Sequence, residues 1–239
     1  MKPFQFKEFS VNQDKTAMKI GTDAVLLGAW ADITRQPDSI LDIGSGTGVI
    51  SLMLAQRTKA MTIDAVEIDE HAYEQTVENF EQSDWGDRLF CYNASFQEFA
   101  KEMTEDEETY ELIISNPPFY TDSFETNDDA RNKARFTSAL SFEDLLNGVA
   151  NILAKKSDFV TIIPFKEEAD FIALAKQNNL FLNRVCHVRG TPESDIKRSL
   201  LSFSFEETKL LKEMLTIEIA RHEYTEAYKK LTKDFYLKM

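Results

Sequence analysis

A glycine-rich turn between an apolar strand and an apolar helix constrains this chain more than any other feature. Residues 39–42 are predicted to form a short buried strand, and an apolar helix is predicted over residues 49–57. Between them lies Ile43-Gly44-Ser45-Gly46-Thr47-Gly48. Glycine lets the backbone come close to a ligand, because no Cβ intervenes, and a helix start offers free N–H groups and a positive dipole end. The turn therefore predicts a ligand-binding loop at the edge of a sheet.

Strands and helices alternate along the rest of the chain. The hydrophobic periodicity predicts further strands over residues 61–67, 88–93, 110–115 and 158–164, and helices over residues 69–83, 141–153 and 166–178, with a short helix after Ser95. Two antiparallel strands, residues 180–188 and 199–205, follow; residues 213–220 can add another strand, and residues 224–237 a last helix. Repeated βα units before a hairpin predict an α/β fold with a doubly wound, mostly parallel seven-stranded sheet and an antiparallel terminal hairpin.

The length and composition suit one cytoplasmic globular domain. The 239 residues, 43% of them hydrophobic, favour a single domain over residues 1–239, of which residues 179–239 form a C-terminal hairpin and helix. No apolar run approaches the ~20 residues of a membrane helix, and no signal peptide is visible. Cys91 and Cys186 lie in apolar strand-like runs and are expected to be reduced thiols. Without clustered Cys and His residues, we expect no metal site; the oligomeric state does not follow from the sequence.

The charge is distributed unevenly along the chain. The net charge is −14, which alone argues against nucleic-acid binding. However, residues 1–130 hold 26 of the 41 acidic residues and only 9 of the 27 Lys and Arg residues. The remaining residues carry a slight positive excess, so a basic face for a polyanion is compatible with the composition, as is an ordinary solvated acidic surface.

The glycine spacing indicates which ligand the loop binds. Gly44, Gly46 and Gly48 follow GxGxG, whereas a dinucleotide site requires GxGxxG, and no Lys-Ser/Thr pair follows as in a phosphate-binding Walker loop. Asp42 before the loop can hold a cationic group, here the amino end of a methionine moiety. Glu67, at the end of the next strand, can accept both hydrogen bonds of a ribose diol. The glycine loop and an acid at this spacing favour an adenosine-type ligand, and with a methionine moiety at Asp42 this ligand would be S-adenosylmethionine.

A second motif follows the strand at residues 110–115. It reads Asn116-Pro117-Pro118-Phe119, at the strand end where such sheets bind ligands. The Asn116 side-chain oxygen and the Pro117 carbonyl can accept the two N–H groups of an exocyclic amine, and Phe119 can stack on a flipped base. Proximity and alignment then carry most of the catalysis. We predict methyl transfer to an amino nitrogen.

These residues resemble the class I methyltransferases, specifically the amino methylases whose mark is (N/D)PP(Y/F). The opening stretch FKEFSVNQDKTAMKIGTDAVLLGAW, the segment ISNPPFY and the ending YTEAYKKLTKDFYLKM further resemble the bacterial tRNA(Val) adenine N6-methyltransferases, over nearly the whole chain. The resemblance implies a Rossmann-like class I fold, tRNA as the partner, and methylation of the adenine immediately 3′ of the anticodon. It also implies that residues 1–35 form an extension over the cofactor site.

The resemblance assigns roles to individual residues. The resemblance implies that four residues lie over the methionine end of the cofactor, namely Lys19, Gly21, Thr22 and Asp23. It implies that Asp42, Gly44 and Gly46 line the cofactor loop and that Glu67 binds the ribose. It also implies that residues 116–119 form the acceptor pocket. The chain departs from the family in two places. Ser95 replaces an acid that contacts the cofactor adenine, and Phe119 replaces the commoner Tyr, as also occurs in guanine N2-methylases.

Basic residues flank the predicted crevice on two segments. We expect phosphate contacts from Arg131, Lys133 and Arg135 after the acceptor motif. The hairpin region adds four more candidates for the same role, Arg184, Arg189, Lys197 and Arg198. Besides tRNA adenine N6-methylation, three functions remain open at this point. They are guanine N2-methylation of RNA, N5-methylation of a protein glutamine, and a cofactor-binding RNA assembly factor with little turnover.

Overall fold

The computed structural model describes residues 2–117 and 140–239, and all structural statements below concern these residues. Its helices are α1 (Thr22–Trp30), α2 (Val49–Arg57), α3 (Glu70–Glu81), α4 (Phe96–Glu105), α6 (Phe142–Ile152), α7 (Glu168–Gln177) and α8 (Glu226–Thr232), with a 3-10 turn η1 (Phe165–Glu167). The strands of the main sheet are β3 (Ser39–Ile43), β4 (Thr62–Glu67), β5 (Leu89–Asn93), β6 (Tyr110–Ser115), β7 (Leu153–Pro164), β8 (Phe181–Arg189), β9 (Ile196–Ser204) and β10 (Leu211–Thr216). Two small hairpins pair β1 (Phe4–Gln5) with β2 (Ser10–Val11) and β11 (Glu218–Ala220) with β12 (Glu223–Tyr224).

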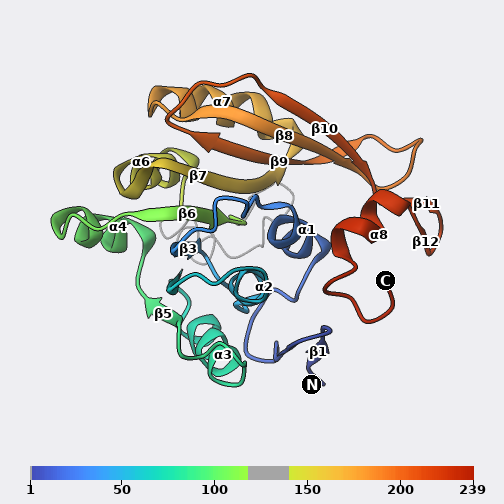
Figure 1. The fold of residues 1–239 in the computed structure, drawn as a ribbon, viewed down its shortest axis with the longest axis horizontal. Helices are drawn as coiled ribbons and strands as arrows, with labels where there is room; N and C mark the ends of the chain where they lie inside the picture. Colours follow the sequence, from blue (N-terminus) through green and yellow to red (C-terminus); the bar gives the residue numbers. More distant parts are fainter. Residues whose placement is uncertain (1, 118–139) are drawn as a thin grey trace, which may run out of the picture.

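The main sheet runs in the order β10-β8-β9-β7-β6-β3-β4-β5 (Figure 1). The neighbours from β7 to β5 are parallel, and β9 is antiparallel to both β7 and β8. The predicted doubly wound, mostly parallel sheet with an antiparallel hairpin is therefore confirmed. The predicted number of seven strands is wrong, because β10 pairs in parallel with β8 and makes an eighth.

An ion pair links this segment to its neighbours in addition to the backbone pairing of β10 with β8. Arg184 of β8 binds the Glu213 carboxylate of β10 through two N–H···O contacts of 2.9 and 3.2 Å. The Trp30 indole donates to the same carboxylate at 2.9 Å, and the Arg184 guanidinium lies 4.1 Å from the centre of the Trp30 ring. Arg184 is therefore used to attach β10 to β8 and α1.

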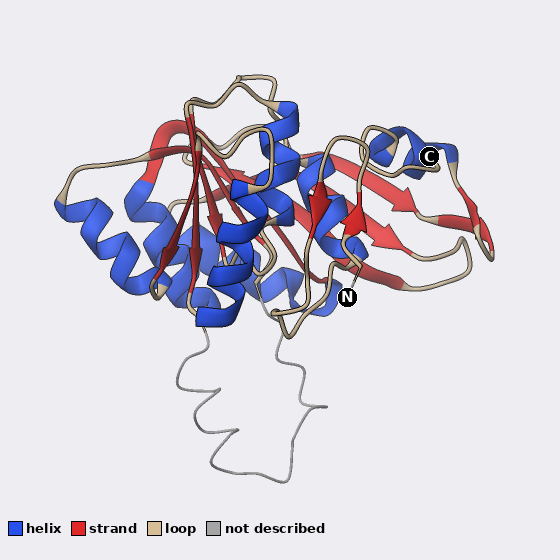
Figure 2. Cartoon of the chain, turned by 90° about the horizontal axis from the view of Figure 1, so that it is seen from below, coloured by secondary structure: helices blue, strands red, loops and turns tan. Residues whose placement is uncertain are grey.

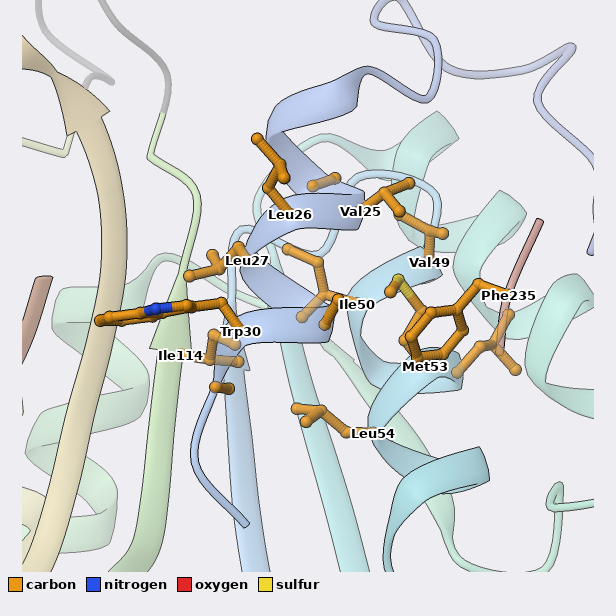
Figure 3. Packing of buried hydrophobic residues seen from close by; sticks show 14 of the residues in the cluster. Val25, Leu26, Leu27, Trp30, Val49, Ile50, Met53, Leu54, Ile114 and Phe235 are labelled. Atoms are coloured by element: carbon orange, nitrogen blue, oxygen red, sulfur yellow. The ribbon is translucent and has the colours of Figure 1, made fainter. Parts of the chain in front are cut away.

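Helices cover the sheet on both faces, with a core on each. Alternate residues of one strand point to opposite faces, so in β6 Leu112 and Ile114 belong to the core with α1 and α2, and Ile113 to the core with α4, α6 and α7. Figure 3 shows Leu27 of α1 near Ile50 of α2, with the Trp30 ring pointing away from α2. Helix α1 was not predicted, because residues 24–30 are all apolar and buried and so show no helical periodicity.

Several local predictions are confirmed by the helix caps. Asp69 accepts from the backbone N–H of Ala72 at the start of α3, and Ser141 from that of Asp144 at the start of α6. The last helix is shorter than the predicted range 224–237, since α8 ends at Thr232. Both cysteines are free, as expected. None of the described helices is long and apolar enough to cross a membrane.

Candidate active site

The two sequence motifs meet at one edge of the sheet. Ile43, the last residue of β3, pairs with Val66 of β4 on one side and with Ser115 of β6 on the other. The Ser115 hydroxyl donates to the Ile43 carbonyl at 3.0 Å. Because these strands are parallel, the glycine loop, Glu67 and Asn116 all leave the sheet at the same carboxyl edge. In Figure 2 a group of neighbouring arrows of the main sheet points in one direction.

The glycines of the loop have left-handed backbones with two different surroundings. Gly44, Gly46 and Gly48 have φ angles of 75°, 59° and 74°, which other residues rarely adopt. A Cβ added to Gly44 or Gly46 would meet nothing within 4 Å, so this part of the loop borders open space. A Cβ on Gly48 would lie 2.7 Å from Cε1 of Phe80, so Gly48 is required for packing against α3. Gly44 and Gly46 are therefore the glycines that a ligand can approach.

Glu67 is held at the end of β4 by two backbone groups. Its carboxylate oxygens accept from the N–H of Gly46 at 2.8 Å and from the N–H of Asp69 at 2.9 Å. Each carboxylate oxygen has a second lone pair, so the carboxylate can still accept from a ribose diol. Ile68, which follows it, is 55% exposed and offers apolar surface at the same strand end. The sequence analysis did not single out Ile68, although an apolar residue between two acids at a strand end was the available signal.

Asp42 is a fully buried carboxylate with one unsatisfied oxygen. Oδ2 accepts from the backbone N–H of Ser51 at 3.2 Å and from its hydroxyl at 2.7 Å. Oδ1 has no hydrogen-bond partner among the described residues. Burial raises the pKa of Asp42 to about 7. A buried acceptor without a partner is costly, so Oδ1 is a place where a cationic ligand group or a bridging water would be stabilised.

The N-terminal segment, residues 12–20, is fastened beside the glycine loop by helix α3. The Asn79 amide accepts from the N–H of Asn12 at 2.8 Å and donates to its carbonyl at 2.9 Å. The same amide donates to the Thr47 carbonyl of the glycine loop at 2.8 Å. Gln75, one turn earlier, accepts from the N–H of Lys15 at 3.0 Å. Both amides are essentially buried, and the sequence analysis missed them because both lie inside a predicted helix.

The four N-terminal residues assigned to the cofactor lie in different settings. Lys19 donates to the carbonyls of Gln13 and Thr16 and thereby closes its own segment into a compact loop. Gly21 stands at the N-cap position of α1 and Thr22 is its first residue, both exposed. Asp23 forms an ion pair with Arg198 of β9, with 2.7 Å between Oδ2 and Nε. The predicted cofactor residue Asp23 and the predicted RNA residue Arg198 are therefore partners.

Ser95 occupies the place of the missing acid and caps helix α4. Its hydroxyl donates to the Glu98 carboxylate at 2.6 Å and accepts from the Glu98 N–H at 3.2 Å. The two residues form a complete capping box. The only hydroxyl hydrogen of Ser95 is thus used within the box, which leaves the oxygen as an acceptor for a ligand.

The acceptor motif and the basic residues are described only in part. Asn116 is half-buried at the end of β6, and Pro117 is buried next to it. Pro118 and Phe119, and the predicted phosphate contacts Arg131, Lys133 and Arg135, lie outside the described residues. Lys197 is exposed on β9 next to Arg198. In the described ranges no group of His, Cys, Asp or Glu side chains could hold a metal ion.

The arrangement fits one cofactor chemistry. Open left-handed glycines, an acid at the end of the second strand and a buried acid before the loop suit the methionine and ribose parts of S-adenosylmethionine, and Asn116 ends the adjacent strand. A sheet of this order with such a site defines a class I methyltransferase that uses S-adenosylmethionine. In keeping with this, the family model "Methyltransferase small domain" matches residues 16–140.

Relatives of known name place the chain in one family. It is 57% identical to a protein of Flavobacterium johnsoniae, over 99% of this chain and 100% of that one, and 56% identical to one of Christiangramia forsetii, over 99% and 98%. It is 41% identical to one of Pseudoalteromonas translucida, over the full length of both. All three are named tRNA1(Val) (adenine(37)-N6)-methyltransferase, and this chain belongs to their family.

Solved structures agree on the fold. A predicted O-methyltransferase from Agrobacterium tumefaciens matches with a TM-score of 0.67 and 19% identity, over 89% of this chain and 96% of that one. The ribosomal protein L11 methylase of Lactobacillus delbrueckii matches with a TM-score of 0.53 and 12% identity, over 76% of each chain. At these identities the likeness supports the architecture alone.

Proposed function

We propose that this protein transfers the methyl group of S-adenosylmethionine to the exocyclic N6 of an adenine in tRNA. The observation that carries the proposal is the family membership, since relatives 53–57% identical over 99% of the chain bear this activity in their names. Following those names, the acceptor is adenine 37 of tRNA1(Val). A tRNA substrate also makes the cytoplasm the expected compartment.

The described residues can perform the steps that this reaction requires. The bound cofactor supplies a methyl carbon on a positively charged sulfur. Gly44 and Gly46 leave room for it, Glu67 accepts from its ribose, and Asp42 favours its cationic amino end. Asn116 and Pro117 offer the two oxygen acceptors that orient the N–H groups of the acceptor amine, so that its lone pair faces the methyl carbon. The acceptor amine would react as the neutral amine through its lone pair, so no general base is needed before transfer. The positive charge would pass from sulfur to that nitrogen, which would then release one proton to solvent, leaving the methylated amine and S-adenosylhomocysteine.

The test is methylation of purified tRNA. The protein is incubated with labelled S-adenosylmethionine and with tRNA from a strain lacking the enzyme, and the digested nucleosides are separated. We expect label in N6-methyladenosine. Label in N2-methylguanosine would refute the adenine assignment. Label found only in release-factor protein, added as the substrate for glutamine methylation, would refute it as well. Cofactor binding without any transfer would indicate an assembly factor.

One variant tests the acceptor site separately. Asn116→Ala removes the side-chain acceptor and should abolish transfer, while binding of S-adenosylhomocysteine, measured by calorimetry, should persist. Ser39→Ala, at the opposite end of β3, is a matched control that should retain both. Full turnover by Asn116→Ala would remove Asn116 from the acceptor pocket.

A further inference from the structure

An exposed aromatic side chain lies at the same edge of the sheet as the acceptor motif. Phe165 directly follows β7 and is 38% exposed. β7 neighbours β6 in parallel, with Ser115 opposite Thr161. Phe165 therefore stands three residues further along its strand than Asn116 does along β6, roughly 10 Å farther out at the strand rise. This places Phe165 beyond Asn116 at the carboxyl edge of the sheet.

A chain of polar contacts holds this ring in place. The His187 ring packs edge-to-face on Phe165, with 5.1 Å between the centroids and an interplanar angle of 82°. His187 Nε2 and Glu168 Oε2 are 2.8 Å apart, and the hydroxyl of the fully buried Ser199 donates to the same oxygen. The contacts run from the sheet interior to the surface. They orient an aromatic ring and leave part of it in solvent.

Three cationic side chains lie near the ring in a chain of net charge −14, and two of them, Lys166 and Arg198, are paired with Glu167 and Asp23. Lys166 is the next residue and is exposed, although it contacts Glu167. Arg198 of β9 lies opposite Pro164, the residue before Phe165, and Lys197 precedes it. An aromatic face among cationic side chains is the combination by which proteins bind single-stranded nucleic acid, through base stacking and phosphate attraction.

We propose that Phe165 is a stacking platform for a base of the tRNA that neighbours the methylated adenine, with His187 and Glu168 as its positioning residues. The inference rests on the proposed function and adds a substrate contact to it. Stacking is tolerant of base identity, so this contact would anchor the loop rather than select its sequence. An aromatic platform outside the acceptor pocket keeps the flanking strand in place while one adenine is turned toward Asn116.

Steady-state kinetics on an anticodon stem-loop test the proposal. Phe165→Ala and Phe165→Leu should lower kcat/KM for the RNA by about 5- to 150-fold, the range for loss of one base–aromatic stack. The loss should appear mainly in KM for RNA, while the affinity for S-adenosylhomocysteine is unchanged. Phe165→Trp should retain activity, because it keeps an aromatic face. Leu keeps apolar volume without that face, so it separates stacking from packing.

Three further measurements complete the test. Phe90→Ala, which truncates an aromatic side chain 43% exposed on the edge strand β5, is the matched control and should have wild-type kinetics. Stem-loops with 2-aminopurine at either nucleotide next to the target should lose fluorescence on binding wild-type protein, and less on binding Phe165→Leu. His187→Ala should weaken RNA binding less than Phe165→Ala does.

The outcomes distinguish this inference from the function on which it rests. No methylation of tRNA by the wild-type protein would overturn both. The stacking contact alone would be overturned if the wild type methylates tRNA and both Phe165→Ala and Phe165→Leu keep the wild-type kcat/KM and the wild-type quenching of 2-aminopurine fluorescence.

Discussion

Replacing Gly48 by Ala should destabilise the protein without blocking its cofactor face. Gly48 has a φ of 74°, and an added Cβ would lie 2.7 Å from Cε1 of Phe80 and 3.1 Å from Cγ2 of Thr76. A left-handed backbone costs a non-glycine residue about 1–2 kcal/mol, and overpacking a core costs about 1–3 kcal/mol. The free energy of unfolding should therefore fall by about 2–5 kcal/mol.

Gly46 provides the matched comparison. Its φ is also positive, at 59°, but an added Cβ would meet nothing within 4 Å. Gly46→Ala should therefore cost only the backbone strain of about 1–2 kcal/mol. Its methyl group would instead enter the space next to the loop and weaken cofactor binding. One glycine of the loop should thus affect mainly stability and the other mainly binding.

Urea unfolding and calorimetric titration with S-adenosylhomocysteine measure the two effects. A Phe80→Leu change should recover part of the loss in Gly48→Ala, because it removes the clashing ring edge. Equal destabilisation by Gly46→Ala and Gly48→Ala would contradict the role of Phe80. Wild-type cofactor affinity in Gly46→Ala would show that the ligand does not approach this part of the loop.

Three further predictions follow from the contacts around the site. Asn79→Ala removes three hydrogen bonds of 2.8–2.9 Å and should cost about 2–4 kcal/mol, with faster amide exchange over residues 12–16 and a higher KM for the cofactor. Gln82→Ala, which removes only exposed side-chain contacts to Asn12 and Glu78, should leave exchange and KM unchanged. Burial raises the pKa of Asp42 to about 7, so the folded protein holds a proton that the unfolded chain releases near pH 4. The stability of the cofactor-free protein should then fall as pH rises from about 4 to about 7, and Asp42→Asn should flatten this dependence in urea titrations; an unchanged slope would contradict it. Glu213→Ala leaves Arg184 and the Trp30 indole without their shared acceptor and should cost about 1–3 kcal/mol, with faster amide exchange in β10; unaltered exchange there would refute the role of this ion pair.

The sequence by itself determined the fold class, the cofactor loop and the order of most elements. Strand and helix periodicity, the Asp69 and Ser95 caps and the spacing of the glycines are local properties, since each depends on residues close together in the chain. The acid of β4 followed from the same reasoning, because βα units place successive strand ends at one edge of the sheet. For these features a short window of sequence contains the physical cause.

Only the tertiary structure decided which distant residues meet. Helix α1 is uniformly apolar, so its helical state depends on the neighbours that bury it. Glu213 of β10 binds Arg184 and Trp30, which lie far from it in the sequence, and Asp23 pairs with Arg198, 175 residues away. Asn79 and Gln75 look like ordinary helix residues until residues 12–15 pack against them. A contact between distant segments depends on the path of the whole chain, which no local pattern records.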